Sequence, residues 1–221
     1  MSLNFIEAEN LLCITRFAQH NAADYWPMLS VQEQKLAEKK VTSSLKNKAI
    51  LSYGLRRTQL ATLLNKNPKQ LTFETTAQQK PILTHTPLHF NVSHSDDYWV
   101  ILVHATHHIG VDIESTTRKV DFLELANRFF AKEETQIMTH AENSSDLFWQ
   151  LWTAKEALLK ATGQGLVNGL EQSALFMNQQ QKWQAHAAEF QSWQLETLII
   201  AENTIISAAI PHNEKLAHYF F

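Results

Sequence analysis

Two pairs of charged residues in the second half of the chain have the types and spacing of a site that handles phosphate. Asp112 and Glu114 are two residues apart in a strand-like segment, so their side chains share one face and lie roughly 6.6 Å apart along it. Carboxylates at that separation repel each other, which raises their pKa values or recruits a cation, and oxygen ligands suit Mg²⁺ better than a transition metal. Glu156 and Lys160 are four residues apart in a helical segment, so their side chains can reach the same point. Each pair alone also occurs on ordinary solvent-facing surfaces, and it is their combination that favours a site.

An amphipathic helix within residues 148–166 must position Glu156 and Lys160. At about 100° per residue its apolar side chains gather into one arc, which consists of Phe148, Leu151, Trp152, Leu158 and Leu159. Lys155 falls inside this arc, and because an ammonium is rarely buried without a partner, we expect it to pair with a neighbouring acid or with a phosphate. Three of the five glycines of the chain, at positions 163, 165 and 169, predict a helix end followed by a close-approach loop.

Residues 109–114 predict the strand that carries the two carboxylates. Alternation along this strand turns three side chains toward the core, namely Ile109, Val111 and Ile113. Gly110 shares the opposite face with Asp112 and Glu114, and we expect its missing side chain to leave room for a bulky ligand.

Apolar periodicity and Pro, Gly and Asn stops predict the remaining elements. Residues 88–103 predict a hairpin with Ser93 and His94 at its mouth. Ser30, with Glu33 three residues later, predicts the cap of the first long helix. We further expect a strand within residues 1–20, helices over 31–40, 45–64, 120–130 and after 131, and strands over 71–73, 175–177, 193–200 and 204–210. Residues 80–83 predict an edge strand or a loop because of Pro81, and we expect a tail from Pro211.

Length and composition indicate a globular protein. The chain has 221 residues, 44% of them hydrophobic and 19% charged, with a net charge of −3, so disordered and fibrous classes are excluded. A single cysteine excludes an intrachain disulfide, and no basic segment followed by a long apolar run opens the chain, so we expect a soluble cytoplasmic protein without membrane contact. A weak repeat of charged helix, loop and strand predicts two similar α+β halves, residues 1–105 and 106–221, for which a monomer is the simpler expectation.

A basic segment in the first half indicates an anionic ligand or partner, although a solvated helix face would have the same composition. Between Lys35 and Lys69 the chain carries nine Lys or Arg and one Glu, a local charge of +8. A nucleic-acid-binding module would use this segment with Trp26 or Tyr53 for stacking, but the acidic strand would repel a phosphate backbone. A Mg²⁺-dependent phosphodiesterase or nuclease would hydrolyse its substrate with Asp112, Glu114 and Glu156.

An ordered series of motifs that spans roughly residues 29–170 resembles the Sfp-type 4′-phosphopantetheinyl transferases, and five segments carry the resemblance. They are K-P at 80–81, F-N-V-S-H-S at 90–95, I-G-V-D-I-E at 109–114, R-F-F-x-x-E-E at 128–134, and W-T-A-K-E-A-L-L-K with its trailing G-x-G-L at 152–166. The resemblance implies an α+β fold, a pseudo-dimer of two similar α/β halves with coenzyme A and Mg²⁺ in the cleft between them. It also implies transfer of the phosphopantetheine arm of coenzyme A to a serine of an apo acyl or peptidyl carrier protein, with release of adenosine 3′,5′-bisphosphate.

Site residues follow from the same resemblance. The implied Mg²⁺ ligands are Asp112, Glu114 and Glu156. The implied coenzyme A contacts are Lys160 on the phosphates, Lys80, Ser93 and His94 at the nucleotide end, Lys48 near the 3′-phosphate, and Lys155 if a phosphate is its partner. Two positions depart from the family pattern: Lys48 replaces an arginine, which exchanges a bidentate fork for a point charge, and Asp96 and Asp97 occupy a turn where glycine is more usual.

The implied reaction fits these residue types. Charge on the phosphate oxygens must be neutralised while the serine attacks, which Mg²⁺ and Lys160 would do, with Asp112 holding the cation. Glu156 is the candidate base, either directly or through a metal-bound water. A carrier protein, which is acidic, would suit a basic rim beside an apolar patch, for which we expect Phe122, Leu123, Phe129 and Phe130.

Overall fold

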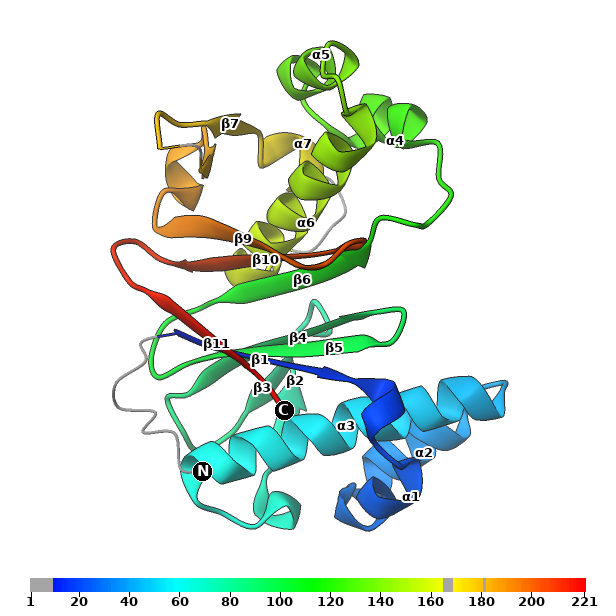
Figure 1. Ribbon diagram of the computed structural model, residues 1–221. Coiled ribbons are helices and arrows are strands. Elements are labelled where there is room, and N and C mark those ends of the chain that lie inside the picture. Colours follow the sequence, from blue (N-terminus) through cyan, green and yellow to red (C-terminus); the bar gives the residue numbers. More distant parts are fainter. Residues whose placement is uncertain (1–9, 165–168, 181) are drawn as a thin grey trace.

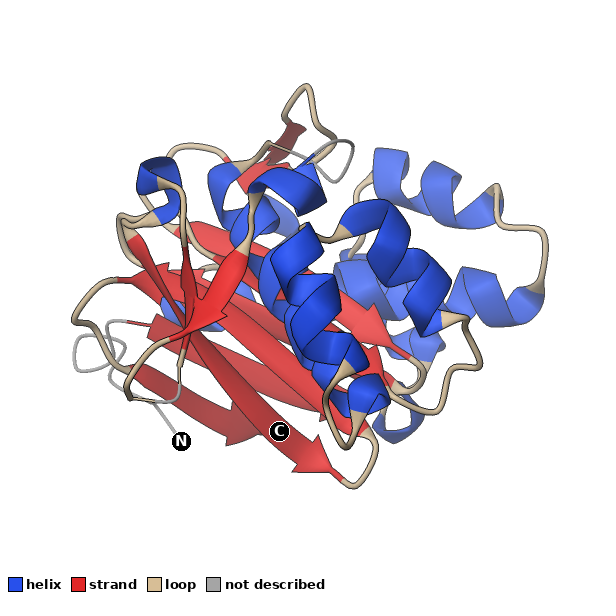
Figure 2. Ribbon diagram, turned by 90° about the horizontal axis from the view of Figure 1, so that it is seen from above, coloured by secondary structure: helices blue, strands red, loops and turns tan. Residues whose placement is uncertain are grey.

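The computed structural model describes residues 10–164, 169–180 and 182–221, whose elements form four layers (Figure 1). Helix α3 (Ser43–Leu64) covers the outer face of a four-stranded sheet, and helix α6 (Ser144–Thr162) covers the outer face of a three-stranded sheet. The first sheet has the order β11-β1-β5-β4, with bounds Leu216–Phe220, Asn10–Arg16, Tyr98–His104 and His89–Ser95. The second has the order β6-β10-β9, with bounds Gly110–Ser115, Thr204–Pro211 and Trp193–Ala201. Seen from above, the strands of the two sheets run in a similar direction, with helices of the second half lying over them (Figure 2).

The two sheets share one topology. In the first half, β1 leads to α3 and then to the hairpin β4–β5, whose second strand pairs antiparallel with β1. In the second half, β6 leads to α6 and then to the hairpin β9–β10, whose second strand pairs antiparallel with β6. The predicted α+β fold with two similar halves is therefore confirmed.

A shared apolar core lies between the two sheets. Ten buried side chains from both halves form it: Leu12, Ile14, Val100, Leu102, Ile109, Val111, Ile113, Ile206, Ala208 and Ile210. The predicted inward face of the 109–114 strand is therefore correct. Separate apolar clusters lie between α3 and the first sheet and between α6 and the second sheet, so each half also has a core of its own.

The side of Gly110 that was expected to face a ligand is in contact with the backbone of α6. A Cβ atom at this position would lie 2.0 Å from the Ala157 carbonyl oxygen and 2.5 Å from the Ala161 nitrogen, both in the backbone of α6. The expectation that Gly110 leaves room for a ligand is wrong, because the space is filled by the helix. The glycine instead allows α6 to lie directly on β6, which brings the helix side chains close to the strand carboxylates.

The helices of the first half begin and end where local chemistry predicts. Helix α2 (Val31–Glu38) starts at Ser30, whose hydroxyl and the Glu33 carboxylate form a capping box, and α3 ends at Asn65 in the left-handed conformation. Two positive charges of the basic segment are internal: Arg56 and Arg57 are buried and both contact Glu33, at 2.6 and 2.7 Å. The surface charge of this segment is correspondingly smaller than the sequence count.

The last strand corrects one expectation. Residues from Pro211 onward were expected to be a tail, but β11 pairs in parallel with β1 from Asn10–Leu216 to Ile14–Phe220. The sheet of the first half therefore contains a strand that the division at residue 105 assigned to the second half.

The shorter helices are α1 (Ala22–Tyr25), α4 (Phe122–Phe129), α5 (Lys132–Thr139) and α7 (Gly169–Gln172), and the shorter strands are β2 (Phe73–Thr75), β3 (Pro81–Leu83), β7 (Leu175–Met177) and β8 (Trp183–Ala185). No helix in the described ranges is both long and apolar enough to cross a bilayer.

Candidate functional site

The two halves meet where edge strand β4 runs beside edge strand β6. Every second side chain of β4 reaches across: Asn91 Oδ1 accepts a hydrogen bond from the Val111 amide at 2.8 Å, and Ser95 Oγ accepts one from the Ser115 amide at 3.2 Å. Between them, Ser93 Oγ donates to Asp112 Oδ1 at 2.8 Å. The polar face of β4 thus satisfies the exposed edge of β6 and fixes the position of Asp112.

Lys160 lies between two carboxylates at this junction. Its ammonium is 2.5 Å from Asp112 Oδ1, 3.5 Å from Glu156 Oε2 and 3.2 Å from Ser93 Oγ. The predicted approach of Glu156 and Lys160 is therefore confirmed, and Lys160 also contacts Asp112. Burial disfavours the charge of Lys160, but Asp112 and Glu156 outweigh it and raise the pKa of this lysine, which keeps it cationic.

Glu114 occupies the outer side of the same cluster. Ser95 Oγ donates to Glu114 Oε2 at 3.0 Å, and Arg118 Nη1 lies 3.1 and 3.3 Å from the two carboxylate oxygens. Burial and the neighbouring Asp112 charge raise the pKa of Glu114. Arg118 was not among the predicted site residues, although its position four residues after Glu114, in a turn, is a signal that could have pointed to it.

Three carboxylates face two cations in this cluster, so negative charge is in excess. Burial, followed by the Asp112 charge, raises the pKa of Glu156 to about 7, and only Lys160 opposes the shift. Asp112 Oδ2 is one of the few buried side-chain atoms in the described part of the chain that have no hydrogen-bond partner. A buried carboxylate oxygen without a donor, beside two further carboxylates, fits a hard divalent cation such as Mg²⁺.

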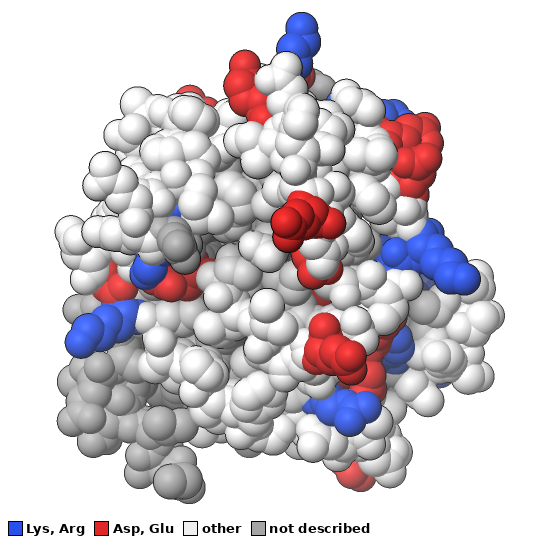
Figure 3. Space-filling view, turned by 45° about the horizontal axis from the view of Figure 1, so that its top comes forward, with Lys and Arg blue, Asp and Glu red and all other residues white. Residues whose placement is uncertain are grey.

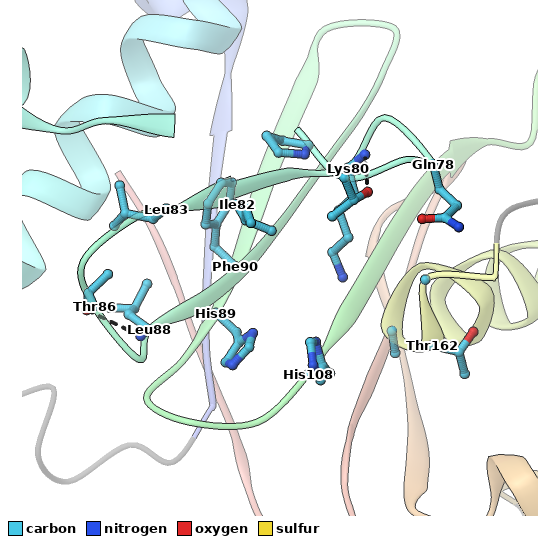
Figure 4. A pocket seen from close by; sticks show the side chains of 14 residues that line it. Gln78, Lys80, Ile82, Leu83, Thr86, Leu88, His89, Phe90, His108 and Thr162 are labelled. Atoms are coloured by element: carbon cyan, nitrogen blue, oxygen red, sulfur yellow. Dashed lines mark hydrogen bonds between the residues drawn. The ribbon is translucent and has the colours of Figure 1, made fainter. Parts of the chain in front are cut away.

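Lys80 ties the hairpin of β2 and β3 to the second half. Its ammonium donates to the Lys160 carbonyl at 2.6 Å and lies 3.3 Å from the Ile109 carbonyl. Burial, together with the nearby Lys160 charge, lowers the pKa of Lys80 to about 8. Lys80 also lines a cavity of about 560 Å³, together with Gln78, His89 and His108. The cavity lies at the end of α6, where Thr162 contributes to its wall (Figure 4).

Lys48 and His94 lie together at the other end of β4. Lys48 donates to the Asp96 carbonyl at 2.7 Å, and partial burial together with the Lys48 charge lowers the pKa of His94. The Asp97 carboxylate is already engaged, by Arg16 at 2.8 Å and by the Ala18 amide at 2.9 Å. One of the two unusual acidic residues is therefore compensated locally.

Comparison with known proteins decides the family. A model of the 4′-phosphopantetheinyl transferase superfamily matches residues 108–209, and a model of the N-terminal region of a 4′-phosphopantetheinyl transferase matches residues 16–106. The 4′-phosphopantetheinyl transferase HetI of Nostoc is 31% identical over 163 residues, which cover 71% of this chain and 68% of HetI. This chain belongs to the 4′-phosphopantetheinyl transferase superfamily.

Other members of the superfamily match a smaller share of their own length. A Synechocystis protein, provisionally named as a 4′-phosphopantetheinyl transferase, is 39% identical over 153 residues, 67% of this chain and 62% of that protein. The transferase Sfp of Bacillus subtilis is 32% identical over 136 residues, 60% of this chain and 59% of Sfp. The matched segments thus span about three fifths of these two relatives.

Lys155 is a predicted coenzyme A contact whose ammonium is paired inside the protein, away from the cluster. Its side chain is fully buried, and its ammonium lies 2.5 and 2.8 Å from the oxygens of Glu134. Glu134 also accepts hydrogen bonds from the Ala131 and Leu175 amides, both at 2.8 Å. Of the two partners expected for the Lys155 ammonium, an acid or a phosphate, the structure contains the acid. Lys155 is therefore not part of the proposed binding site.

Proposed function

We propose that this protein is a Mg²⁺-dependent 4′-phosphopantetheinyl transferase that modifies a serine of an apo carrier protein. The observation that carries the proposal is the junction at which Asp112 and Glu156 both contact Lys160, with Asp112 Oδ2 buried and unpaired and Glu114 two residues further along the same strand. Membership of the superfamily supplies the reaction class. We propose Asp112, Glu114 and Glu156 as the residues that would hold the cation, which would offset negative charge on the phosphate oxygens.

Lys160 and Glu156 have complementary roles in this proposal. Lys160 stays protonated between its carboxylates, so it can bind a phosphate oxygen of coenzyme A. In the transfer, the serine oxygen forms a bond to phosphorus, the pyrophosphate P–O bond breaks, and adenosine 3′,5′-bisphosphate departs. The serine proton goes to Glu156, whose carboxylate lies beside Lys160 at the junction.

Coenzyme A would lie along the junction of the halves. Lys48 provides positive charge and His94 an imidazole that can form a hydrogen bond at one end of β4, Ser93 lies further along the strand, and Lys80 lines the 560 Å³ cavity. A further pocket of about 310 Å³ is lined by both Lys80 and Lys160, and it shares Lys80 with the larger cavity. We propose these four residues as contacts of the nucleotide end.

We propose that the carrier protein docks on α4, near the carboxylates of β6 and α6. Leu123 is 40% exposed, whereas Phe130 is only 5% exposed and stacks on Phe148 in the core, so Phe130 is removed from the proposed apolar patch. Phe122 and Phe129 are partly buried against the same core. We therefore centre the docking surface on Leu123.

A nucleic-acid-binding function fits less well. Arg56 and Arg57 of the basic segment are buried and share the Glu33 carboxylate, so they are not available at the surface. On the face drawn in Figure 3, acidic and basic side chains are scattered among uncharged ones and do not make a continuous basic surface. Binding of a phosphate backbone needs such a surface.

Intact-mass measurement of a panel of apo carrier proteins tests the proposal. The protein is incubated with each carrier, coenzyme A and Mg²⁺, and the expected result is a gain of one phosphopantetheine arm that disappears with EDTA and in Glu156→Gln. Glu142→Gln, at an exposed position outside the cluster, is the matched control and should retain activity. Coenzyme A that stays intact with every carrier would refute the proposal, and cleavage without transfer would indicate a phosphodiesterase.

A further inference from the structure

The carboxylates of the candidate metal site are paired with two cations that differ in how firmly they are held. Lys160 has three contacts within the cluster, to Asp112, Ser93 and Glu156, and its side chain is only 25% exposed. Arg118 contacts Glu114 alone within the cluster, through one guanidinium nitrogen, and its side chain is 56% exposed. Arg118 can therefore leave its carboxylate and remain hydrated, whereas Lys160 cannot.

The chain after β6 is folded so that Arg118 returns to Glu114. The Thr116 amide donates to the Asn203 carbonyl at 2.9 Å, and the hydroxyls of Ser115 and Thr117 lie 2.8 Å apart. This turn anchors the backbone on the β9–β10 connection and directs the Arg118 guanidinium back over the strand. The guanidinium also lies 5.7 Å from the ring centre of Trp149, so it makes a cation–π contact in addition to its contact with Glu114.

Glu114 does not depend on Arg118 for its orientation. Ser95 Oγ donates to Oε2 at 3.0 Å, and Ser95 is itself fixed by the Ser115 amide. Arg118 lies within hydrogen-bonding distance of both carboxylate oxygens, so it occupies the positions from which Glu114 would ligate a cation. A divalent cation at Glu114 and the guanidinium at its present position would repel each other.

We infer that Arg118 is a positioning residue that neutralises Glu114 while the site lacks a divalent cation and competes with the cation for this carboxylate. The inference rests on the proposed function, because it takes Glu114 as a ligand. Its consequence is that Arg118 weakens cation binding and so sets the cation concentration at which the site fills. Lys160, held inside, keeps its place when the cation binds.

Direct measurement of cation affinity tests this inference without using activity. Mn²⁺ binding to the full chain is followed by electron paramagnetic resonance and Mg²⁺ binding by calorimetry. Arg118→Gln should bind both ions at least about fivefold more tightly than the wild type, because a nearby positive charge is removed while Ser95 still orients Glu114. Arg118→Lys, which keeps the charge, should stay near the wild-type affinity. Arg128→Gln, an exposed arginine on α4 with no contact to the cluster, is the matched control and should not change it.

Several outcomes separate this inference from the proposed function. Unchanged or weaker binding by Arg118→Gln, or equal tightening by Arg118→Lys, would overturn the inference alone, provided that Glu114→Gln weakens binding. Tightening by Arg118→Gln that persists in the Glu114→Gln background would overturn it too, because competition requires that carboxylate. If the wild type bound neither ion, or if Glu114→Gln left the affinity unchanged, both the metal site and the role of Arg118 would be wrong.

Discussion

Glu156 is the residue whose protonation depends most directly on how the two halves meet. Its carboxylate is buried beside Asp112 and Glu114, and Lys160 compensates it only in part. Lys160 is close to Glu156 in the sequence, whereas Asp112 and Glu114 lie in a distant segment. The raised pKa is therefore a property of the assembled junction, and it links protonation of one side chain to the stability of the fold and to the proposed catalysis.

In the absence of divalent cations, Glu156 should make the folded state less stable as the pH rises. Its folded-state pKa of about 7 is above the ordinary 4.5, so the folded protein binds this proton more tightly than the unfolded chain does. The contribution is fully present below about pH 4.5 and is lost as the pH rises through about 7, for a total of about 3 kcal/mol. Urea unfolding in EDTA between pH 4.5 and 8 should show this loss in the wild type and not in Glu156→Gln. An identical pH dependence in both proteins would contradict the shift.

At the scale of elements, the contact between α6 and β6 sets the geometry of the site. Gly110 lets the helix backbone rest on the strand, and the capping glycine at 163 ends the helix just after Lys160. The side chains of Glu156 and Lys160 then lie within reach of Asp112 without a loop between them. Rigid elements on both sides hold the charged groups together against their repulsion.

Gly110 at this contact and Gly163 at the end of α6 should differ sharply in their tolerance of alanine. Gly110→Ala would place a methyl group 2.0 Å from the Ala157 carbonyl oxygen, so α6 must move, and the free energy of unfolding should fall by about 3 kcal/mol or more. Gly163→Ala meets open space at φ 76°, and only the left-handed backbone opposes it, at about 1 to 2 kcal/mol. Urea denaturation with both variants checks the prediction. Equal costs would mean that α6 does not pack on β6 as described.

At the scale of the whole molecule, the two halves are joined by apolar packing as well as by the polar junction. The core between the sheets takes side chains from β1 and β5 on one side and from β6 and β10 on the other. The return of β11 to the first sheet adds a covalent and hydrogen-bonded connection. We therefore expect the described halves to unfold as one cooperative unit.

Two isoleucines on the second sheet test this cooperation. Ile206 is fully buried between the sheets, whereas Ile199 on the neighbouring strand is 68% exposed. Ile206→Ala should lower the free energy of unfolding by about 2 to 5 kcal/mol, and Ile199→Ala by no more than about 0.5 kcal/mol. Fluorescence and circular dichroism should give coincident transitions for the wild type and for both variants. Separate transitions for the two probes would show that the halves unfold independently.

The sequence by itself determined the features that depend on neighbouring residues. Helix caps at Ser30 and Gly163, the alternation along 109–114 and the approach of Glu156 to Lys160 all follow from backbone periodicity over a few residues, and the structure contains them. The ordered motifs likewise identified the superfamily.

Only the tertiary structure decided the features whose partners are far apart in the chain. Lys155 pairs with Glu134, 21 residues away, and β11 pairs with β1, more than 200 residues away, so local patterns left one partner open and missed the other. Gly110 was misread because the atoms that fill its space belong to α6, and Asp112 meets Ser93 and Lys160 only because β4 and α6 both pack against β6. Packing between distant segments places these charges, and periodicity within a segment contains no information about it.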